Sequence, residues 1–250
     1  MQESGGRGIE SEERRTPSYM AEKVLSPDMK PPQAVTSNVR VVDTGLCGTS
    51  RYRLNFVNAS GQGLSPWHRL PLYSGKRQLS FVCTTTRGTT VKFELAVQET
   101  LNPLKVVINS QGKSDHWPEK LEWNFGFLPQ TWGDPSRRYE DSSVPSEGVG
   151  PVINSNDLPL DVVDIGSRPA SAGEVYKVKP LAAFAVIDMI TDRMSWKVVA
   201  IAITDPLAND INCLWDLEEN LPGKLLHIQE WLTACTGQCV PLQPSRHDLP

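Results

Sequence analysis

Short runs of alternating apolar and polar residues, each bounded by turn-forming residues, recur along most of this chain. Runs of this kind are typical of short β-strands. They cover residues 51–58, 78–86, 91–97 and 104–110, and the sequences of 174–189 and 195–203 indicate two further, buried strands. This spacing favours a mainly β fold, a closed or nearly closed β-barrel with a few flanking helices.

Helical periodicity occurs only near the end of the chain. Within residues 210–235, apolar residues recur three and four positions apart, at Leu221, Leu225, Ile228 and Leu232. This spacing predicts helical structure there, with one apolar face.

The segment before the first strand differs from the rest in composition. Residues 1–37 are rich in Gly, Ser, Glu and Pro, and Pro27, Pro31 and Pro32 would interrupt a helix. We expect a disordered N-terminal extension over 1–37, one barrel domain over 38–240 and a flexible tail over 241–250.

Charge and hydropathy exclude several classes of partner. The formal net charge is −4 over 250 residues, and the sequence pI is about 5.6. This balance does not attract nucleic acid or an anionic membrane, so we expect neither as a partner. No apolar run reaches the roughly 18 residues that a membrane span requires. The first residues are acidic and lack an apolar run, which favours a cytoplasmic location and leaves a mitochondrial one open.

The five cysteines are scattered, and only Cys235 and Cys239 are close in sequence. A disulfide framework is therefore not expected. No second pair of cysteines or histidines lies nearby to complete four zinc ligands, so zinc is also disfavoured.

Residues 155–167, with the sequence SNDLPLDVVDIGS, combine acids with branched apolar residues. Asp157, Asp161 and Asp164 could offer the carboxylate oxygens that Mg²⁺ prefers. The segment is typical of a metal-binding loop from which some carboxylates are missing.

Five sequence blocks between about residues 39 and 232 carry a resemblance to a known family. In order they are SPWHRLPLY, VKFELAVQETLNPLK, WNFGFLPQTWGDP, LPLDVVDIGS and SWKVVAIAITDP. They resemble family I soluble inorganic pyrophosphatases of the eukaryotic type. The resemblance implies a five-stranded OB-like β-barrel with outer helices, a homodimer, and hydrolysis of diphosphate to two phosphates with several Mg²⁺ ions. It also implies one more helix after the end of the barrel domain, so we expect a barrel domain that is shortened at its C-terminus.

The resemblance assigns roles to the residues that match the family pattern. The implied catalytic residues are Lys92, Glu94, Asp161 and Lys197. Phosphate binding would involve Arg87, Lys92 and Lys197, and Mg²⁺ binding would involve Glu94, Asp161, Asp188 and, if the loop alignment shifts by one residue, Asp157.

Other positions depart from the family pattern. Neutral residues stand in place of acids at Thr84, Asn156, Leu158 and Ser195, Phe125 stands in place of a phosphate-facing Tyr, and Cys235 and Thr236 stand in place of a Tyr-Lys pair. The segment 110–120, where the family has a phosphate-binding Arg, contains none. These losses predict weak or absent hydrolysis, because each electrostatic stabiliser typically contributes about 10² to 10³ in rate.

Structural roles are the alternative for the matching residues. Lys92 and Glu94 would point to the same face of a strand and could form cross-strand ion pairs. Asp188 could belong to a polar turn between strands.

Two hypotheses from different classes follow. The chain is either a Mg²⁺-dependent diphosphatase, slow on inorganic diphosphate or redirected to an organic diphosphate, or a catalytically silent binding or regulatory protein. An enzyme must bind Mg²⁺ at millimolar or tighter concentration, whereas a silent protein need not.

Overall fold

The computed structural model describes residues 39–136, 138–140, 152–188 and 193–241. All of them belong to one compact unit, residues 31–242. The predicted extension over 1–37 lies outside the described residues. So does the predicted tail, except for residue 241, which ends the last strand.

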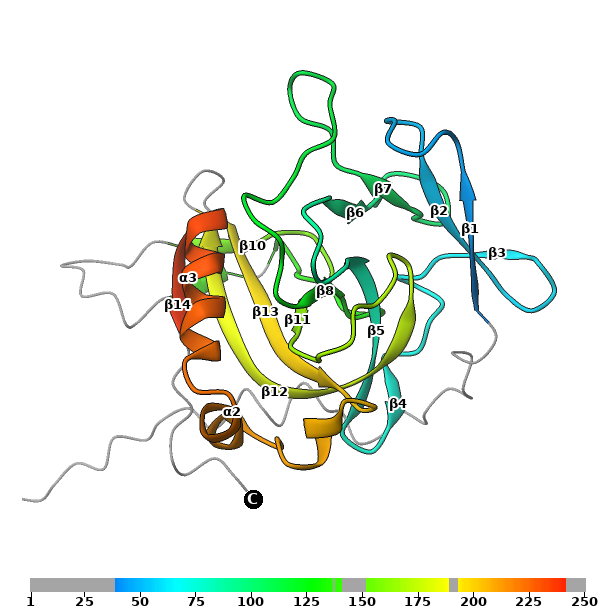
Figure 1. The fold of residues 1–250 in the computed structure, drawn as a ribbon. Helices are drawn as coiled ribbons and strands as arrows, with labels where there is room; N and C mark the ends of the chain where they lie inside the picture. The colour runs from blue at the N-terminus through cyan, green and yellow to red at the C-terminus, as the bar shows by residue number, and fades with distance from the viewer. Residues whose placement is uncertain (1–38, 137, 141–151, 189–192, 242–250) are drawn as a thin grey trace, which may run out of the picture. The chain divides into compact units, whose positions relative to one another are not determined.

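The described strands form two sheets (Figure 1). The five-stranded sheet contains β1 (Arg40–Thr44), β2 (Arg53–Val57), β3 (Gly63–Leu64), β6 (Phe93–Leu95) and β7 (Leu104–Val106). The nine-stranded sheet contains β4 (Tyr73–Gly75), β5 (Gln78–Thr85), β8 (Asn124–Phe127), β9 (Arg138–Glu140), β10 (Val152–Ser155), β11 (Asp161–Asp164), β12 (Val175–Asp188), β13 (Arg193–Ala202) and β14 (Gly237–Pro241). The expected mainly β class is confirmed.

Five strands of the larger sheet pair in a closed ring. The order is β12, β5, β8, β11 and β13, and β13 pairs again with β12. Strand β12 can close the ring because its two halves have different partners: Val175–Val178 pairs with β5, and Val178–Asp188 pairs with β13. A register shift lies between Pro180 and Ala182, where proline cannot donate a ladder hydrogen bond. The expected five-stranded, OB-like ring is confirmed.

Close packing in the ring requires a glycine on β8. A Cβ atom at Gly126 would lie 2.0 Å from the Val82 carbonyl oxygen and 2.8 Å from the Phe81 ring. Strands β5 and β8 can therefore approach as they do only because residue 126 has no side chain.

Alternation along the ring strands separates two apolar clusters. Phe81, Cys83, Val162, Val178 and Ala200 pack together on one face. On β11 and β13, Val163, Val199 and Ile201 point the other way and pack against helical residues that include Leu217, Ile228 and Leu232.

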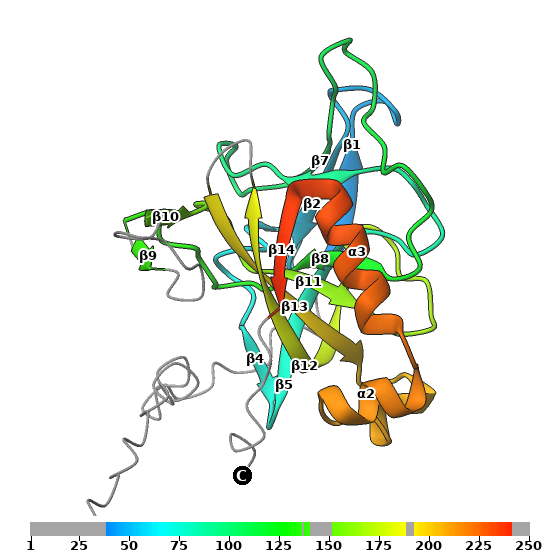
Figure 2. The same ribbon diagram turned by 90° about the vertical axis from the view of Figure 1, so that its left-hand side faces the viewer.

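The helices are η2 (Pro206–Asn209), α2 (Leu214–Asn220) and α3 (Lys224–Thr236). Sequence periodicity correctly located helical structure in this region, but Pro222 and Gly223 divide it into two helices. Gly223 has a φ of 75°, a left-handed conformation that ends a helical path. Figure 2 shows α3 running alongside β14. Among the described residues, no helix combines the length and apolar character needed to cross a membrane.

Asp164 has a structural role inside the fold. Its side chain is 1% exposed and accepts hydrogen bonds from Asn124 Nδ2 at 3.0 Å and the Tyr176 hydroxyl at 2.6 Å. It also accepts from the backbone N–H groups of Gly166 at 3.0 Å and Ala202 at 2.9 Å. Burial, and then the Asp164 charge, raise the pKa of Tyr176 far above its usual value, so this hydroxyl stays protonated as a donor.

Candidate functional site

Asp161 and Lys197 form an ion pair on neighbouring strands. Strands β11 and β13 are parallel, and their register places Asp161 directly beside Lys197. The Lys197 ammonium donates to Asp161 Oδ2, and the Lys197 residue is only 7% exposed. Two residues that the sequence predicted for catalysis are therefore adjacent, and each neutralises the other.

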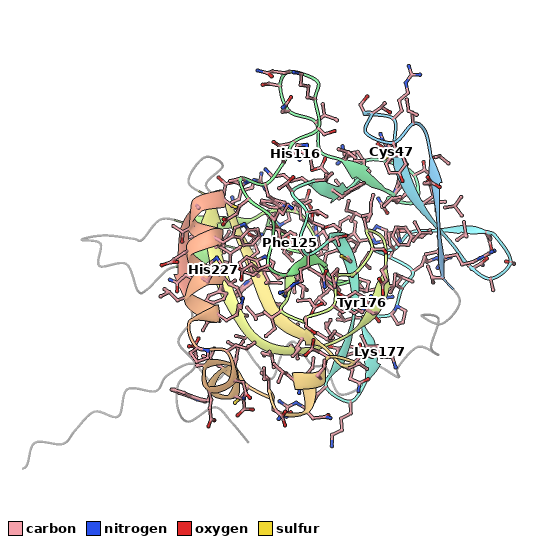
Figure 3. The ribbon with its side chains drawn as sticks, viewed as in Figure 1. Cys47, His116, Phe125, Tyr176, Lys177 and His227 are labelled. Atoms are coloured by element: carbon pink, nitrogen blue, oxygen red, sulfur yellow. The ribbon has the colours of Figure 1, made fainter. Side chains whose placement is uncertain are left out.

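This pair lies on the face of the ring that is turned toward α3. Alternation places Asp161 on the same face as Val163, and Lys197 on the same face as Val199, both of which pack in the helix-facing cluster. Phe125 from β8 belongs to the same surroundings, because its ring centroid lies 5.6 Å from that of Trp231 on α3. Figure 3 shows Phe125 of the sheet and His227 of α3 on these facing elements.

Lys92 forms a second ion pair, with Asp115. The Lys92 ammonium lies 2.8 Å from Asp115 Oδ2 and 4.7 Å from the centroid of the Trp117 ring. The hydrogen bond from Lys92 holds the pKa of Asp115 below its usual value. Trp117 in turn packs against Phe125 and Trp231, with centroid distances of 5.8 and 5.1 Å. Aromatic packing thus connects the Lys92 side of the site to the ring face that bears Asp161.

Both lysines lie on elements that adjoin α3. Lys92 packs on Trp117, whose ring contacts Trp231 of α3. Lys197 lies on the ring face that packs against the helices. Near the end of α3, partial burial raises the pKa of the Cys235 thiol, and the charges of Lys92 and Lys197 act in the opposite direction.

Glu94 lies in a cross-strand pair instead. Glu94 on β6 is paired in register with Lys105 on β7, and the Lys105 ammonium lies 3.2 Å from its carboxylate. The Glu94 side chain is 49% exposed. For Glu94, this is the alternative structural role that the sequence had suggested.

Arg87 is held on another part of the fold. Its Nη1 donates to the Gly166 carbonyl oxygen at 3.3 Å, and its backbone N–H donates to Asn124 Oδ1 at 3.0 Å. The hydrogen bond from Lys224 lowers the pKa of Glu122, and the Arg87 charge acts in the same direction. The role of Arg87 in binding phosphate stays a prediction.

The loop before β11 is tied to the segment that contains Trp132. Asp157 has a φ of 62° and accepts a hydrogen bond from the Trp132 indole N–H at 2.7 Å. The backbone N–H of Gly133 donates to the Leu158 carbonyl oxygen, and that of Asp157 donates to the Gly133 carbonyl oxygen. Asn156 Oδ1 accepts from the Leu158 N–H at 3.3 Å. The loop therefore directs one side of the Asp157 carboxylate to an indole, while Leu158 is 40% exposed.

Asp188 lies at the end of β12. Its backbone is paired with Arg193 on β13 and with Gly237 on β14. Ser195, where the family pattern has an acid, is paired with Val186 on β12. Val186 lies two residues before Asp188. The metal-binding role of Asp188 stays a prediction.

The donor set fits a Mg²⁺ site poorly. Mg²⁺ prefers a near-octahedral shell of carboxylate and water oxygens. Yet the Asp161 carboxylate is bound to Lys197, Glu94 to Lys105, and Asp157 to Trp132. Within the described ranges, no group of three or more His, Cys, Asp or Glu side chains is arranged to hold a metal ion.

Two parts of the site were missed at the level of sequence. The sequence patterns indicated neither Asp115 as the partner of Lys92 nor Trp117 as the ring beside it. The available signal was the substitution pattern in 110–120, where an acid occurs in a segment from which the family's Arg is absent.

Fold and site together define a protein built on a closed β-ring, with the Asp161–Lys197 ion pair on the ring face that packs against the helices. The family model for inorganic pyrophosphatase matches residues 81–237. The chain therefore belongs to the inorganic pyrophosphatase family.

Individual relatives agree with this assignment. The chain is 38% identical over 193 residues to soluble inorganic pyrophosphatase 6, chloroplastic, of Arabidopsis thaliana, which covers 77% of this chain and 61% of that protein. The chain thus spans less than two thirds of the length of such curated relatives.

Solved structures show the same fold. The type I inorganic pyrophosphatase of Toxoplasma gondii superimposes with a TM-score of 0.71 at 30% identity, covering 84% of this chain and 89% of that one. An N-terminally truncated vacuolar soluble pyrophosphatase of Trypanosoma cruzi, solved in complex with PPi, gives a TM-score of 0.68 at 26% identity, covering 97% and 89%.

Proposed function

We propose that this chain binds diphosphate beside Lys92 and Lys197 and hydrolyses it to two phosphates slowly, with Mg²⁺ weakly bound if at all. The observation that carries the proposal is that Lys92 packs on Trp117, which contacts Trp231 of α3, while Lys197 lies on the ring face that packs against the helices. Ammonium groups suit phosphate oxygens and stabilise the charge that phosphoryl transfer redistributes. Family membership, and the T. cruzi relative solved with PPi, support diphosphate as the ligand.

Slow turnover follows from the residues that replace acids and a hydroxyl of the family pattern. Leu158 has no oxygen ligand, Asn156 offers only a neutral amide, and Phe125 has no hydroxyl. Losses within one catalytic constellation do not add, but several together remove most of the rate enhancement.

The test is phosphate release from diphosphate by the purified chain with Mg²⁺. An Asp161→Asn variant is the control, because it keeps the side-chain shape and removes the carboxylate beside Lys197. Slow release that disappears in this variant is expected. Equal signals from the two proteins would contradict hydrolysis at this site.

A silent binding or regulatory role is the second candidate. It is favoured by the pairing of the matching charged residues inside the protein: Lys92 with Asp115, Glu94 with Lys105, and Lys197 with Asp161. Diphosphate binding without phosphate release would select this role over the first.

An organic diphosphate is the third candidate. Phe125 replaces a hydroxyl-bearing residue in the family pattern, and Leu158 and Trp132 are 40% and 55% exposed around the loop that precedes Asp161. An apolar surface of this kind suits the organic group of a substituted diphosphate. Faster release from an organic than from inorganic diphosphate would support this candidate.

Oligomeric state and compartment belong to the same proposal. The family resemblance favours a homodimer, which light scattering of the purified chain would test. A cytoplasmic location stays a prediction, and two curated relatives are named as chloroplastic. Imaging of the tagged chain would decide between these compartments.

A further inference from the structure

The two lysines of the site are each already neutralised by a carboxylate of the chain. Lys92 is bound by Asp115, and Lys197 is bound by Asp161. In a site that assembles around divalent cations, carboxylates face the metal. Here both carboxylates face ammonium groups, which are also the groups that a phosphate would bind.

Asp115 is held at Lys92 by the backbone as well as by its side chain. The Lys92 N–H donates to the Asp115 carbonyl oxygen at 3.3 Å, and the Asp115 N–H donates to the Val107 carbonyl oxygen at 2.7 Å. Val91, which precedes Lys92, and His116, which follows Asp115, form an antiparallel β-bridge. The fold therefore presents the Asp115 carboxylate to Lys92 in a fixed position.

Solvent reaches this pair, so an external anion can compete for the lysine. The side chains of Lys92 and Asp115 are 25% and 35% exposed. The pair of Lys197 and Asp161 is less accessible, at 9% and 23%. The more exposed pair, Lys92 with Asp115, contributes little net free energy, because water screens its attraction. A diphosphate carries several charges and many acceptor oxygens, so it can compete with a single carboxylate for an ammonium group.

We propose that diphosphate binds here as a free anion that displaces Asp115 and Asp161 from Lys92 and Lys197, without a divalent cation held by the protein. The inference rests on the proposed function, because it uses the same site and the same ligand. In this binding mode the diphosphate takes the place of the protein's own carboxylates at the lysines. Binding through Mg²⁺ held by those carboxylates, which the donor set does not fit, is not needed.

The sign of a mutational effect distinguishes the two arrangements. If Asp115 and Asp161 compete with the ligand, their neutralisation strengthens diphosphate binding. If the carboxylates bind a metal that in turn binds diphosphate, neutralising Asp161 weakens binding. Neutralising Asp161 thus strengthens diphosphate binding in the first case and weakens it in the second.

The experiment is isothermal titration of the whole chain with sodium diphosphate, once in EDTA and once with Mg²⁺. The expected result is binding in EDTA that Asp115→Asn and Asp161→Asn each tighten by about two- to fivefold. Lys92→Met should weaken it. Asp43→Asn is the matched control, because it removes one negative charge from β1, and it should leave the affinity nearly unchanged.

Three results would overturn the inference. The first is wild-type binding that requires Mg²⁺ and is lost in EDTA, which would leave the proposed function standing. The second is no binding in either buffer, which would overturn the proposed diphosphate site as well. The third is an equal or weaker affinity in both Asn variants, relative to Asp43→Asn, when circular dichroism shows all three to be folded.

Discussion

Asp161 and Lys197 are side-by-side neighbours on parallel strands β11 and β13, and the lysine ammonium donates to the aspartate carboxylate. The register of the two strands fixes this contact. In the next two pairs, Val162 lies beside Val198 and Val163 beside Val199. Val162, Val163 and Val199 are buried, so a shift in register would expose apolar side chains. The charge of the site is therefore set by the packing of the ring.

Loss of Lys197 should destabilise the protein. Lys197→Met keeps the aliphatic volume but leaves the Asp161 carboxylate, whose side chain is 23% exposed, without its cation. We expect unfolding free energy to fall by about 1–3 kcal/mol, measured by urea denaturation. Lys105→Met is the control, because its pair with Glu94 is 35% and 49% exposed and should contribute under about 1 kcal/mol. Equal losses in the two variants would contradict the special position of the Asp161 pair.

Loss of Lys92 should raise the pKa of Asp115. The hydrogen bond from Lys92 is the largest cause that lowers this pKa below its ordinary value of 3.8. The pair therefore contributes stability above that ordinary pKa, and the contribution is lost as pH falls through the lower pKa of the folded protein. Titration of Asp115 by NMR should give a higher pKa in Lys92→Met and no change in Lys105→Met. An unchanged pKa in Lys92→Met would exclude the ion pair in solution.

The Tyr176 hydroxyl should contribute to stability through Asp164. Tyr176→Phe removes the 2.6 Å hydrogen bond and leaves a carboxylate that is 1% exposed with one donor fewer. A cost of about 1–3 kcal/mol in unfolding free energy is expected. Tyr52→Phe is the comparison, because the Tyr52 hydroxyl makes only an exposed 3.4 Å contact with Asp43, and it should cost less than about 0.5 kcal/mol. If Tyr176→Phe leaves the unfolding free energy unchanged, the lost hydrogen bond does not contribute, and water would take the place of the missing donor.

The sequence predicted the strands well because the fold is built from local alternation. The runs at 51–58, 78–86, 174–189 and 195–203 correspond to β2, β5, β12 and β13. By contrast, nothing local in the last residues indicated β14, whose pairing with Phe184–Asp188 is a long-range contact. Ring closure through the two halves of β12 is likewise a tertiary property. The strand spacing favoured a closed or nearly closed barrel, and the five-stranded form came from the family resemblance.

The site was harder to predict than the fold. Lys92 and Lys197 were recognised by position in family motifs, but their partners depend on which segments lie beside them. Asp115 reaches Lys92 through the pairing of residues near 91 and 116, a contact that no local pattern encodes.

Restoring the missing acids should restore hydrolysis if only those acids are absent. The triple variant Asn156→Asp, Leu158→Asp and Ser195→Asp adds three carboxylates around Asp161 and should increase both Mg²⁺ affinity and phosphate release. Because one electrostatic stabiliser is typically worth about 10² to 10³ in rate, a gain of at least about tenfold is expected, measured as Mg²⁺-dependent phosphate release from diphosphate. The matched control is Leu158→Asn with Ser195→Asn, which keeps size and polarity without charge, and should give no gain. If the triple variant folds and binds Mg²⁺ but remains as slow as this control, the missing phosphate-binding groups limit the reaction: the Tyr hydroxyl replaced at Phe125, and the pair replaced at Cys235 and Thr236.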